Sequence, residues 1–418
     1  MKPGSSPLAH FSRSLAVACA LVLFVVPARA GEEPGSSLRI SLLTMSPGDM
    51  AFTKFGHDAL LVEDTVSGAN RVYNYGTFVF GSPWLALDFL RGNLKYWLSV
   101  SSLPTVIRHY AAEQRSISAQ ELRLPPAERA RIAELLATTE RSDARYYKYD
   151  YYRDNCATRV RDVVDRATGG RLRAVSNGPA PFTYREETLR LTESDVLLSL
   201  GLDLAMGPLI DRPLTTWDAE FLPARLADAV RTVRIPGPSG DEPLVVAERV
   251  LLSAPGRTLA TAPPRYWPSL FAAGLALLGV LTSLGVRAGR GSRAARVTLA
   301  LLLAMTGLVF GVLGSVIVGL FSLTDHAVTY FDANVLLCTP WSIALAVVAR
   351  GVARGGFRAT SRARALTVAS LVTSMLALAA LPFSPQKNVE FVAFFLPLWL
   401  GASLALLLAR RPATEPAR

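Results

Sequence analysis

Hydrophobic and polar positions are distributed differently on the two sides of Tyr266. From residue 31 to residue 265 the pattern changes every few residues, and no apolar run reaches the roughly 20 residues that a bilayer span needs. Beyond that point, five long apolar segments predict membrane-spanning helices at 266–286, 297–322, 335–349, 365–383 and 390–409. The third segment is short for a span, so we expect its helix to begin earlier.

The first 30 residues have the features of a secretory signal peptide. Lys2 and Arg13 precede an apolar stretch from Leu15 to Val26, and the small residues at 28 and 30 suit a cleavage site. We therefore expect an exported chain with five parts. These are a signal peptide at 1–30, a soluble domain at 31–250, a linker at 251–265, a transmembrane domain at 266–410 and a cytoplasmic tail at 411–418.

The charge pattern orients the chain in the membrane. Lys and Arg number 44 against 33 Asp and Glu, a formal net charge of +11. Twelve arginines, more than the whole excess, lie in 287–296, in 350–364 and after residue 409. Arg-rich loops stay cytoplasmic, whereas the loops 324–334 and 384–389 hold one lysine and no arginine and should face outward. The soluble domain then lies in the periplasm, beside the inner membrane of a Gram-negative cell, and we expect no nucleic-acid partner.

Local patterns within the soluble domain predict an α+β fold. Apolar or alternating stretches predict strands at 38–43, 55–63, 71–80 and 116–124, and an extended aromatic run at 146–152. Amphipathic spacing and capping residues predict helices at 104–114, from 125 onward, at 156–167, and around 186–207 and 216–232. The proline-rich stretches 236–243 and 255–268 are typical of linkers.

Cys156 is the one cysteine of the predicted soluble domain. An unpaired thiol in an oxidising compartment calls for a reason. This thiol begins a predicted helix behind Asp154 and Asn155, where first-turn N–H groups and the helix dipole would stabilise a thiolate. Cysteine is more often a small buried hydrophobe, so the residue alone does not establish a nucleophile.

A thiolate nucleophile needs a base, and His57 is the best placed histidine because it lies on a predicted strand after a glycine. Asn74, on the neighbouring predicted strand, is the candidate to orient the imidazole, with Asp58 and Asp64 as alternatives. A strand-borne histidine that faces a thiol at a helix start is a papain-like arrangement with the order reversed. The chain has no P-loop, zinc-type cluster or dinucleotide fingerprint, and we expect no metal and no organic cofactor.

Several motifs resemble those of one bacterial family. They are Ser41-Leu42-Leu43-Thr44, Phe55-Gly56-His57, Tyr73-Asn74-Tyr75-Gly76-Thr77-Phe78, Asp154-Asn155-Cys156-Ala157-Thr158-Arg159 and, in the membrane half, Thr324-Asp325-His326 with Asn334. They are similar to the lipoprotein N-acyltransferase family Lnb, once known only as a domain of unknown function. The likeness covers nearly the whole mature chain, which departs from the family at Asp332, where an asparagine is more usual.

The resemblance implies both a fold and a reaction. The fold would be a permuted papain-like domain, similar to the NlpC-type enzymes but with histidine before cysteine, followed by an all-α bundle of about five transmembrane helices. The enzyme would move a fatty acyl chain from a phospholipid to the N-terminal amine of a diacylated lipoprotein through a thioester on Cys156, with His57 as general acid and base. For Arg159 an ion pair within the structure is the alternative to a headgroup contact. The substrate-binding residues would be Asn155, Tyr73, Arg159, His326 and Asn334.

Two other functions fit the same residues. A membrane-anchored cysteine hydrolase, either a peptidase or a lipid esterase, would use the same pair of residues with water in place of the amine. A non-catalytic membrane sensor or scaffold would need neither residue, and replacement of Cys156 would leave its function intact. The acyltransferase interpretation predicts three partners, namely a phospholipid donor, a diacylated lipoprotein and the bilayer. The sequence leaves the oligomeric state open.

Overall fold

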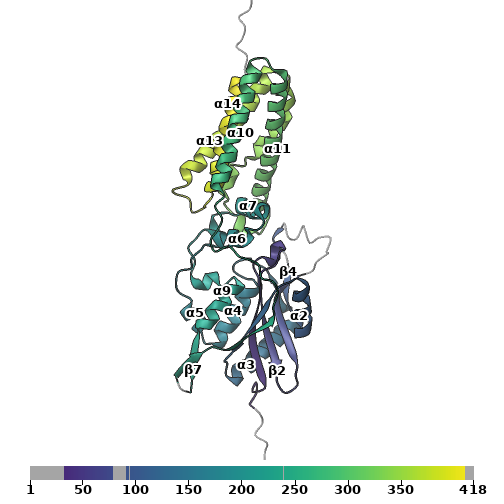
Figure 1. The fold of residues 1–418 in the computed structure, drawn as a ribbon, viewed down its shortest axis with the longest axis vertical. Helices are drawn as coiled ribbons and strands as arrows, with labels where there is room; N and C mark the ends of the chain where they lie inside the picture. The colour runs from purple at the N-terminus through teal and green to yellow at the C-terminus, as the bar shows by residue number, and fades with distance from the viewer. Residues whose placement is uncertain (1–32, 79–90, 94, 239, 410–418) are drawn as a thin grey trace, which may run out of the picture.

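The structure, a computed structural model, describes residues 33–78, 91–93, 95–238 and 240–409. An antiparallel sheet with flanking helices forms one part of the molecule, and a bundle of long helices extends from one end of it (Figure 1). The predicted signal peptide and cytoplasmic tail lie outside the described residues.

Seven strands form one sheet in which neighbouring strands are antiparallel. The order across the sheet is β6-β4-β3-β2-β1-β5-β9. The strands are β1 (Leu38–Met45), β2 (His57–Asp64), β3 (Asn70–Thr77), β4 (Lys95–Ser101), β5 (Ile117–Leu122), β6 (Tyr146–Lys148) and β9 (Val245–Leu252). The sequence therefore predicts the central strands correctly, because their apolar residues are buried on the sheet.

Helices cover both faces of the sheet within the described residues. They are α2 (Leu103–Ala112), α3 (Pro126–Arg141), α4 (Cys156–Ala167), α5 (Arg171–Val175), α6 (Tyr184–Thr192), α7 (Val196–Ala205), α8 (Thr216–Ala219) and α9 (Pro223–Thr232). Helix α2 packs on one face, and α3, α4 and α9 pack on the other. Helices α6 and α7 lie between the sheet and the bundle (Figure 1).

The strand register assigns each sheet residue to one face. Leu42 lies opposite Leu60, and both belong to the core beneath α3, α4 and α9. Leu43 lies opposite Ala59, and both belong to the smaller core beneath α2. Side chains alternate along a strand, so odd-numbered residues of β2 face α2 and even-numbered residues face α4.

Five apolar segments form the bundle, and each is long and apolar enough to cross a membrane. They are α10 (Trp267–Gly289), α11 (Arg293–Leu323), the segment Ala333–Ala353, α13 (Phe357–Ala380) and α14 (Val389–Leu408). This confirms the five helices predicted from the sequence. The third segment begins before residue 335, as expected, and its short 3-10 turns precede α12 (Ala344–Ala353). Pro340 interrupts it because proline has no N–H to donate.

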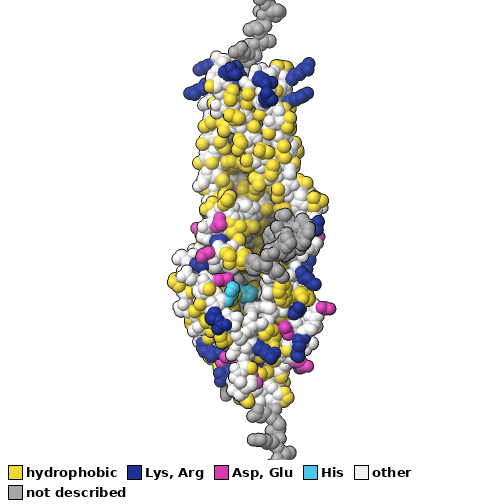
Figure 2. Space-filling view, turned by 90° about the vertical axis from the view of Figure 1, so that its right-hand side faces the viewer, with side chains coloured by type: hydrophobic (Ala, Val, Ile, Leu, Met, Phe, Trp, Pro, Cys, Tyr) yellow, Lys and Arg dark blue, Asp and Glu magenta, His cyan; other side chains and the backbone are white. Residues whose placement is uncertain are grey.

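The basic side chains of the bundle gather at the end far from the sheet (Figure 2). The arginines of the loops 287–296 and 350–364 belong to this end. Since arginine-rich ends stay on the cytoplasmic side, the sheet domain lies on the opposite side of the membrane.

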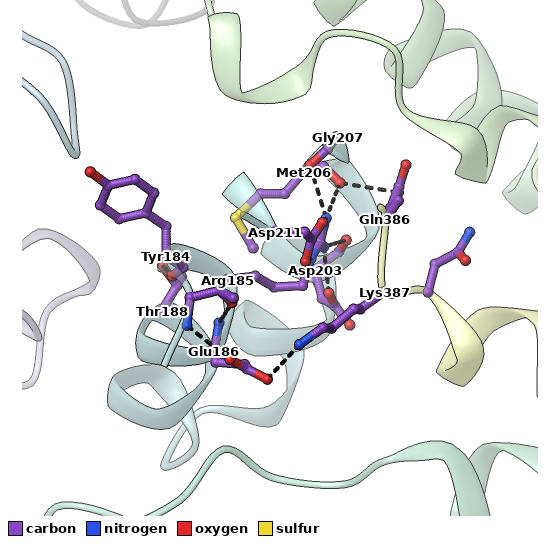
Figure 3. A network of polar contacts seen from close by, with 12 residues as sticks. Tyr184, Arg185, Glu186, Thr188, Asp203, Met206, Gly207, Asp211, Gln386 and Lys387 are labelled. Atoms are coloured by element: carbon purple, nitrogen blue, oxygen red, sulfur yellow. Dashed lines mark hydrogen bonds and ion pairs between the residues drawn. The ribbon is translucent and has the colours of Figure 1, made fainter. Parts of the chain in front are cut away.

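A buried arginine joins α6 to α7 at the junction with the bundle (Figure 3). Arg185 donates to Asp203 at 2.7 Å and to both carboxylate oxygens of Asp211 at 2.8 and 2.9 Å, and all three side chains are at most 2 % exposed. The guanidinium also donates to the carbonyls of Met206 and Gly207. With the carbonyl of Asp203, which also accepts from Arg185, two carboxylates and three carbonyls satisfy a charge that would otherwise be costly to bury.

The loops of the bundle contact the same region. Gln386 donates to the Met206 carbonyl at 3.2 Å and to Asp332 at 2.7 Å. Nearby, the ammonium of Lys387 pairs with Glu186 at 2.9 Å. These contacts, drawn in part in Figure 3, hold the sheet domain against the outward-facing loops.

Some elements differ from their prediction. The prediction of a linker at 236–243 is wrong, because β7 (Arg234–Gly237) and β8 (Gly240–Pro243) pair there as a hairpin. Strands β4 and β9 are missing from the prediction, and only the first three residues of 146–152 form a strand. The helix predicted at 186–207 is two helices, since Asp195 caps a new one.

Candidate active site

Asn155 fixes the start of helix α4. Its side chain accepts from the backbone N–H of Thr158 at 2.9 Å, and the Thr158 hydroxyl accepts from the backbone N–H of Asn155 at 2.8 Å. This reciprocal capping box places Cys156 at the first helical position. The Asn155 amide also donates to the carbonyls of Tyr151 and Phe221 at 3.0 and 2.9 Å. Both of its N–H bonds are therefore used within the protein, and a substrate contact stays a prediction.

The Cys156 thiol lies among backbone N–H groups. The backbone N–H groups of Asp58, Ala157 and Cys156 itself lie near the sulfur and act to lower the pKa of the thiol. The side chain is only 8 % exposed, and this burial raises the pKa of the thiol to about 12, more than the N–H groups lower it. Burial thus acts on the thiol pKa in the opposite direction to the helix start, and the nucleophilic role of Cys156 stays a prediction.

Asp58 is the acidic residue beside this thiol. Its place on β2 assigns its side chain to the α4 face, opposite Thr44, whose hydroxyl donates to one carboxyl oxygen at 3.0 Å. The other oxygen is buried without a hydrogen-bond partner among the described residues. Burial raises the pKa of Asp58 to about 8, and an ionised Asp58 would raise the thiol pKa further.

His57 and its predicted partner Asn74 lie near each other, and the His57 side chain is on the face of the sheet opposite the thiol. His57 lies opposite Met45, which belongs to the core beneath α2. The Asn74 side chain hydrogen-bonds to the imidazole and favours its charged form, whereas burial and the guanidinium of Arg115 lower the pKa of His57 to about 4. The imidazole is therefore neutral at physiological pH and able to accept a proton.

The imidazole and the thiol lie near the end of the sheet where β2 and β3 are not paired with each other. The β2–β3 ladder begins only at Leu60 and Tyr73, so the strands are unpaired beside His57. A Cβ atom on Gly76 would lie 3.6 Å from the Cβ of Cys156, which places the thiol next to this unpaired part of β3. The hydrogen bonds of the described residues include none between His57 and Cys156. The alternative orienting residue Asp64 lies at the far end of β2.

Arg159 makes an ion pair, which was the alternative to a headgroup contact. Its guanidinium binds both carboxylate oxygens of Asp154 at 2.6 and 2.8 Å and lies 3.7 Å from the ring centre of Tyr147. Tyr73, also predicted to bind substrate, is 3 % exposed in the core beneath α4. Both positions support the wall of the site, and no substrate contact follows from them.

A tyrosine cluster connects the thiol region to the membrane side. Tyr149 lies next to Gly76 and stacks on Tyr96 with ring centres 4.2 Å apart. It also meets Tyr151 edge-on at 5.8 Å, and Tyr151 stacks on His326 at 6.2 Å. The chain of rings leads from the β3 residue beside Cys156 to the outward loop after α11.

His326 lines a pocket between the sheet domain and that loop. The pocket is small and partly open to solvent, and it is also lined by Tyr96, Tyr149, Tyr151, Asp150 and Asp325. An ion pair of 2.8 Å between Lys148 and Asp325 closes one side. The sequence predicts His326 as a substrate contact; its tyrosine and aspartate neighbours come from segments too distant for pattern analysis to bring together.

Asn334 has a structural position. It is fully buried, donates to the Leu204 carbonyl of α7 at 3.0 Å and accepts from Asn388 at 2.9 Å. These bonds link α7 to the bundle, and the predicted substrate contact remains untested. Within the described ranges, no group of three or more histidine, cysteine or acidic residues is arranged to hold a metal ion.

Comparison with known proteins identifies the N-terminal part of the chain. Residues 31–190 match the profile of the family described as the Lnb N-terminal periplasmic domain. No curated protein and no solved structure matches the chain. The matched region runs from β1 into α6 and includes Cys156, His57 and Asn74. Over residues 31–190 the chain is therefore similar to the Lnb N-terminal periplasmic domain.

Proposed function

We propose that this protein is a membrane-bound lipoprotein N-acyltransferase that uses Cys156 as its nucleophile. The observation that carries the proposal is the thiol at the first position of α4, with three backbone N–H groups around its sulfur. This site lies in the region similar to the Lnb periplasmic domain, and the chain continues into five apolar helices. The similarity supports acyl transfer, and the helices suit substrates that are themselves held in a bilayer.

In the first half-reaction, the Cys156 sulfur attacks the ester carbonyl carbon of a phospholipid. His57 accepts the thiol proton and returns it to the departing alcohol as the carbon–oxygen bond breaks. The products are an acyl thioester and a lysophospholipid. The N–H groups of Cys156 and Ala157 are the available donors for the negative oxygen that forms on the carbonyl.

In the second half-reaction, the α-amino group of a diacylated lipoprotein attacks the thioester carbon. A neutral amine is needed, and an α-amino pKa near 8 leaves a useful neutral fraction at neutral pH. The amine loses a proton to His57, the carbon–sulfur bond breaks, and the proton returns to the Cys156 sulfur. An amide-linked third acyl chain and a free thiol result.

The proposal makes a structural demand on His57. Its imidazole has to reach the thiol at the end of the sheet where β2 and β3 are unpaired, as in a papain-like site in which a strand and a helix start share the chemistry. The pocket with His326 lies on the bilayer side of the tyrosine cluster, and we assign it to the substrate head that approaches from the membrane.

The test is a mass spectrum of the N-terminal peptide of one lipoprotein from cells depleted of their usual N-acyltransferase. The wild-type protein should add a third acyl chain, and Cys156→Ala and His57→Ala should not. Cys338→Ala is the matched control, because this second free cysteine is buried in the bundle and should be dispensable. Diacyl peptide in every sample, with all variants inserted in the membrane, would contradict the transferase and favour the hydrolase.

A further inference from the structure

Helix α7 carries an apolar stripe that the sheet domain does not cover. Leu197, Leu200, Gly201 and Leu204 follow one another at the spacing of one helix face. Leu200 and Leu204 pack against the core of the bundle. Leu197 continues the stripe and is 84 % exposed. We infer that α7 is an interfacial helix whose Leu197 side lies in the outer leaflet of the bilayer.

The rest of α7 fixes this orientation. Ser199 and Asp203 are buried on the side that meets Arg185, so the helix cannot turn its stripe away from the bundle without breaking that ion pair. The turn before the helix is held as well, because Ser194 accepts from the ammonium of Lys54 at 3.0 Å. The exposed leucine therefore occupies a fixed place on the molecule.

The level of α7 along the bundle matches the edge of the hydrocarbon layer. Asn334 joins the Leu204 carbonyl to Asn388, which immediately precedes α14. Helix α14 has 20 residues, and at 1.5 Å per residue it spans about 30 Å, the thickness of a hydrocarbon core. With its cytoplasmic end at the arginine-rich side, its first residue lies at the outer boundary, and α7 lies beside it.

Other exposed apolar side chains occur at the same end of the bundle. Leu323, the last residue of α11, is 80 % exposed, and Phe383, which follows α13, is 88 % exposed. Figure 2 shows apolar side chains along the bundle, and Figure 1 shows α7 at the end of the bundle next to the sheet domain. These exposed side chains identify lipid as the occupant, because the same bilayer that surrounds the helices reaches the stripe.

The consequence for the sheet domain is a fixed height above the membrane. The apolar stripe holds one side of α7 in the bilayer, and the ion pair with Arg185 holds the opposite side of the helix to the sheet domain. The thiol region is then held close to lipid headgroups without a flexible linker. This inference concerns the position of α7 and does not depend on the proposed reaction.

Spin-label accessibility tests the position. A label is placed at Leu197→Cys in the full chain with Cys156→Ala and Cys338→Ala, reconstituted in vesicles of phosphatidylethanolamine and phosphatidylglycerol. Val66→Cys is the matched control, since Val66 is 76 % exposed on the β2–β3 turn. The label at 197 should collide several-fold more often with lipid-soluble oxygen than with a water-soluble nickel complex, and the label at 66 should show the reverse ratio.

Two results would overturn the inference. Equal access of the nickel complex to positions 197 and 66 would place α7 in water. Protection of position 197 from both reagents would mean that protein covers the stripe, as in contact between two copies of the chain. Equal thermal unfolding of the two labelled proteins is the control for folding.

Discussion

His57 and Asp58 are neighbours in the chain, yet their side chains lie on opposite faces of β2. His57 faces the core beneath α2 together with Met45, and Asp58 faces α4 and the thiol. The backbone N–H of Asp58 lies near the Cys156 sulfur, so β2 approaches the thiol with its backbone. Of these two titratable groups, Asp58 is the one that shares the face of the thiol and acts on its pKa.

The low pKa of His57 makes stability depend on pH. The unfolded chain protonates this residue near pH 6.5 and the folded protein only near pH 4. As pH falls through this window the unfolded state binds more protons, so the free energy of unfolding falls, by up to about 3 kcal/mol. Thermal unfolding of the detergent-solubilised protein from pH 7 to pH 4 measures this loss of stability. His57→Gln should lose this part of the dependence, and the exposed His109→Gln should keep it; parallel curves for wild type and His57→Gln would contradict the prediction.

Asp58→Asn should make the thiol more reactive in alkaline solution. Above about pH 8 Asp58 is ionised, and its negative charge raises the pKa of Cys156; the asparagine removes this charge. Alkylation of the Cys156 peptide, followed by mass spectrometry, should be several-fold faster in the variant at pH 9 and nearly unchanged at pH 6. The Cys338 peptide of the same sample is the internal control. A variant slower than wild type at pH 9 would exclude the electrostatic role.

Arg185→Leu should destabilise the junction strongly. It leaves Asp203 and Asp211 buried without a counter-charge, which typically costs about 3–5 kcal/mol. Arg212→Leu breaks a partly exposed pair with Asp218 and should cost less than about 1 kcal/mol. Thermal unfolding of the two variants compares the effects, and equal melting temperatures would show that the buried network contributes no more than a surface pair.

Gly207→Ala should disturb the contact between the sheet domain and the bundle. A Cβ at this position would fall 2.1 Å from the Tyr330 carbonyl oxygen, and the backbone of Thr329 and Tyr330 leaves no room for it. Gly201→Ala meets nothing within 4 Å and replaces glycine in a helix, so it should stabilise by about 0.5–1 kcal/mol. Limited proteolysis and melting temperature should separate the two variants; a Gly207→Ala protein as stable as wild type would contradict the close packing.

The sequence predicts those features that depend on short stretches of chain. The apolar runs predict the five long helices, and the Asn155–Thr158 spacing predicts the start of α4 at Cys156, because both signals lie within a few turns. The pairing of His57 with Asn74 also follows from adjacent strands. Strand β4 has the alternating pattern of a half-buried strand and is missing from the prediction without a physical reason, whereas β9 is hard to predict because it is an exposed edge strand.

The pKa values of the site residues, and the faces of the sheet on which they lie, follow only from the tertiary structure. A cysteine at a helix start predicts a lowered pKa, but that rule takes no account of burial, and burial dominates at Cys156. Likewise, the order of residues does not say that His57 and the thiol are on different faces, since that depends on the register between β1 and β2. Arg185 with its two aspartates is a third example, because its partners lie 18 and 26 residues further along the chain.

Strand β9 has a consequence for the synthesis of the protein. It is the last strand of the chain, and it pairs with β5, which is made much earlier. Until β9 has been exported, β5 exposes a row of unpaired N–H and C=O groups, the kind of edge on which chains aggregate. The first membrane helix follows soon after β9, so the edge is closed only when translation reaches the membrane region. A chain that stalls before residue 245 is therefore left with an open edge and becomes a substrate for periplasmic chaperones and proteases.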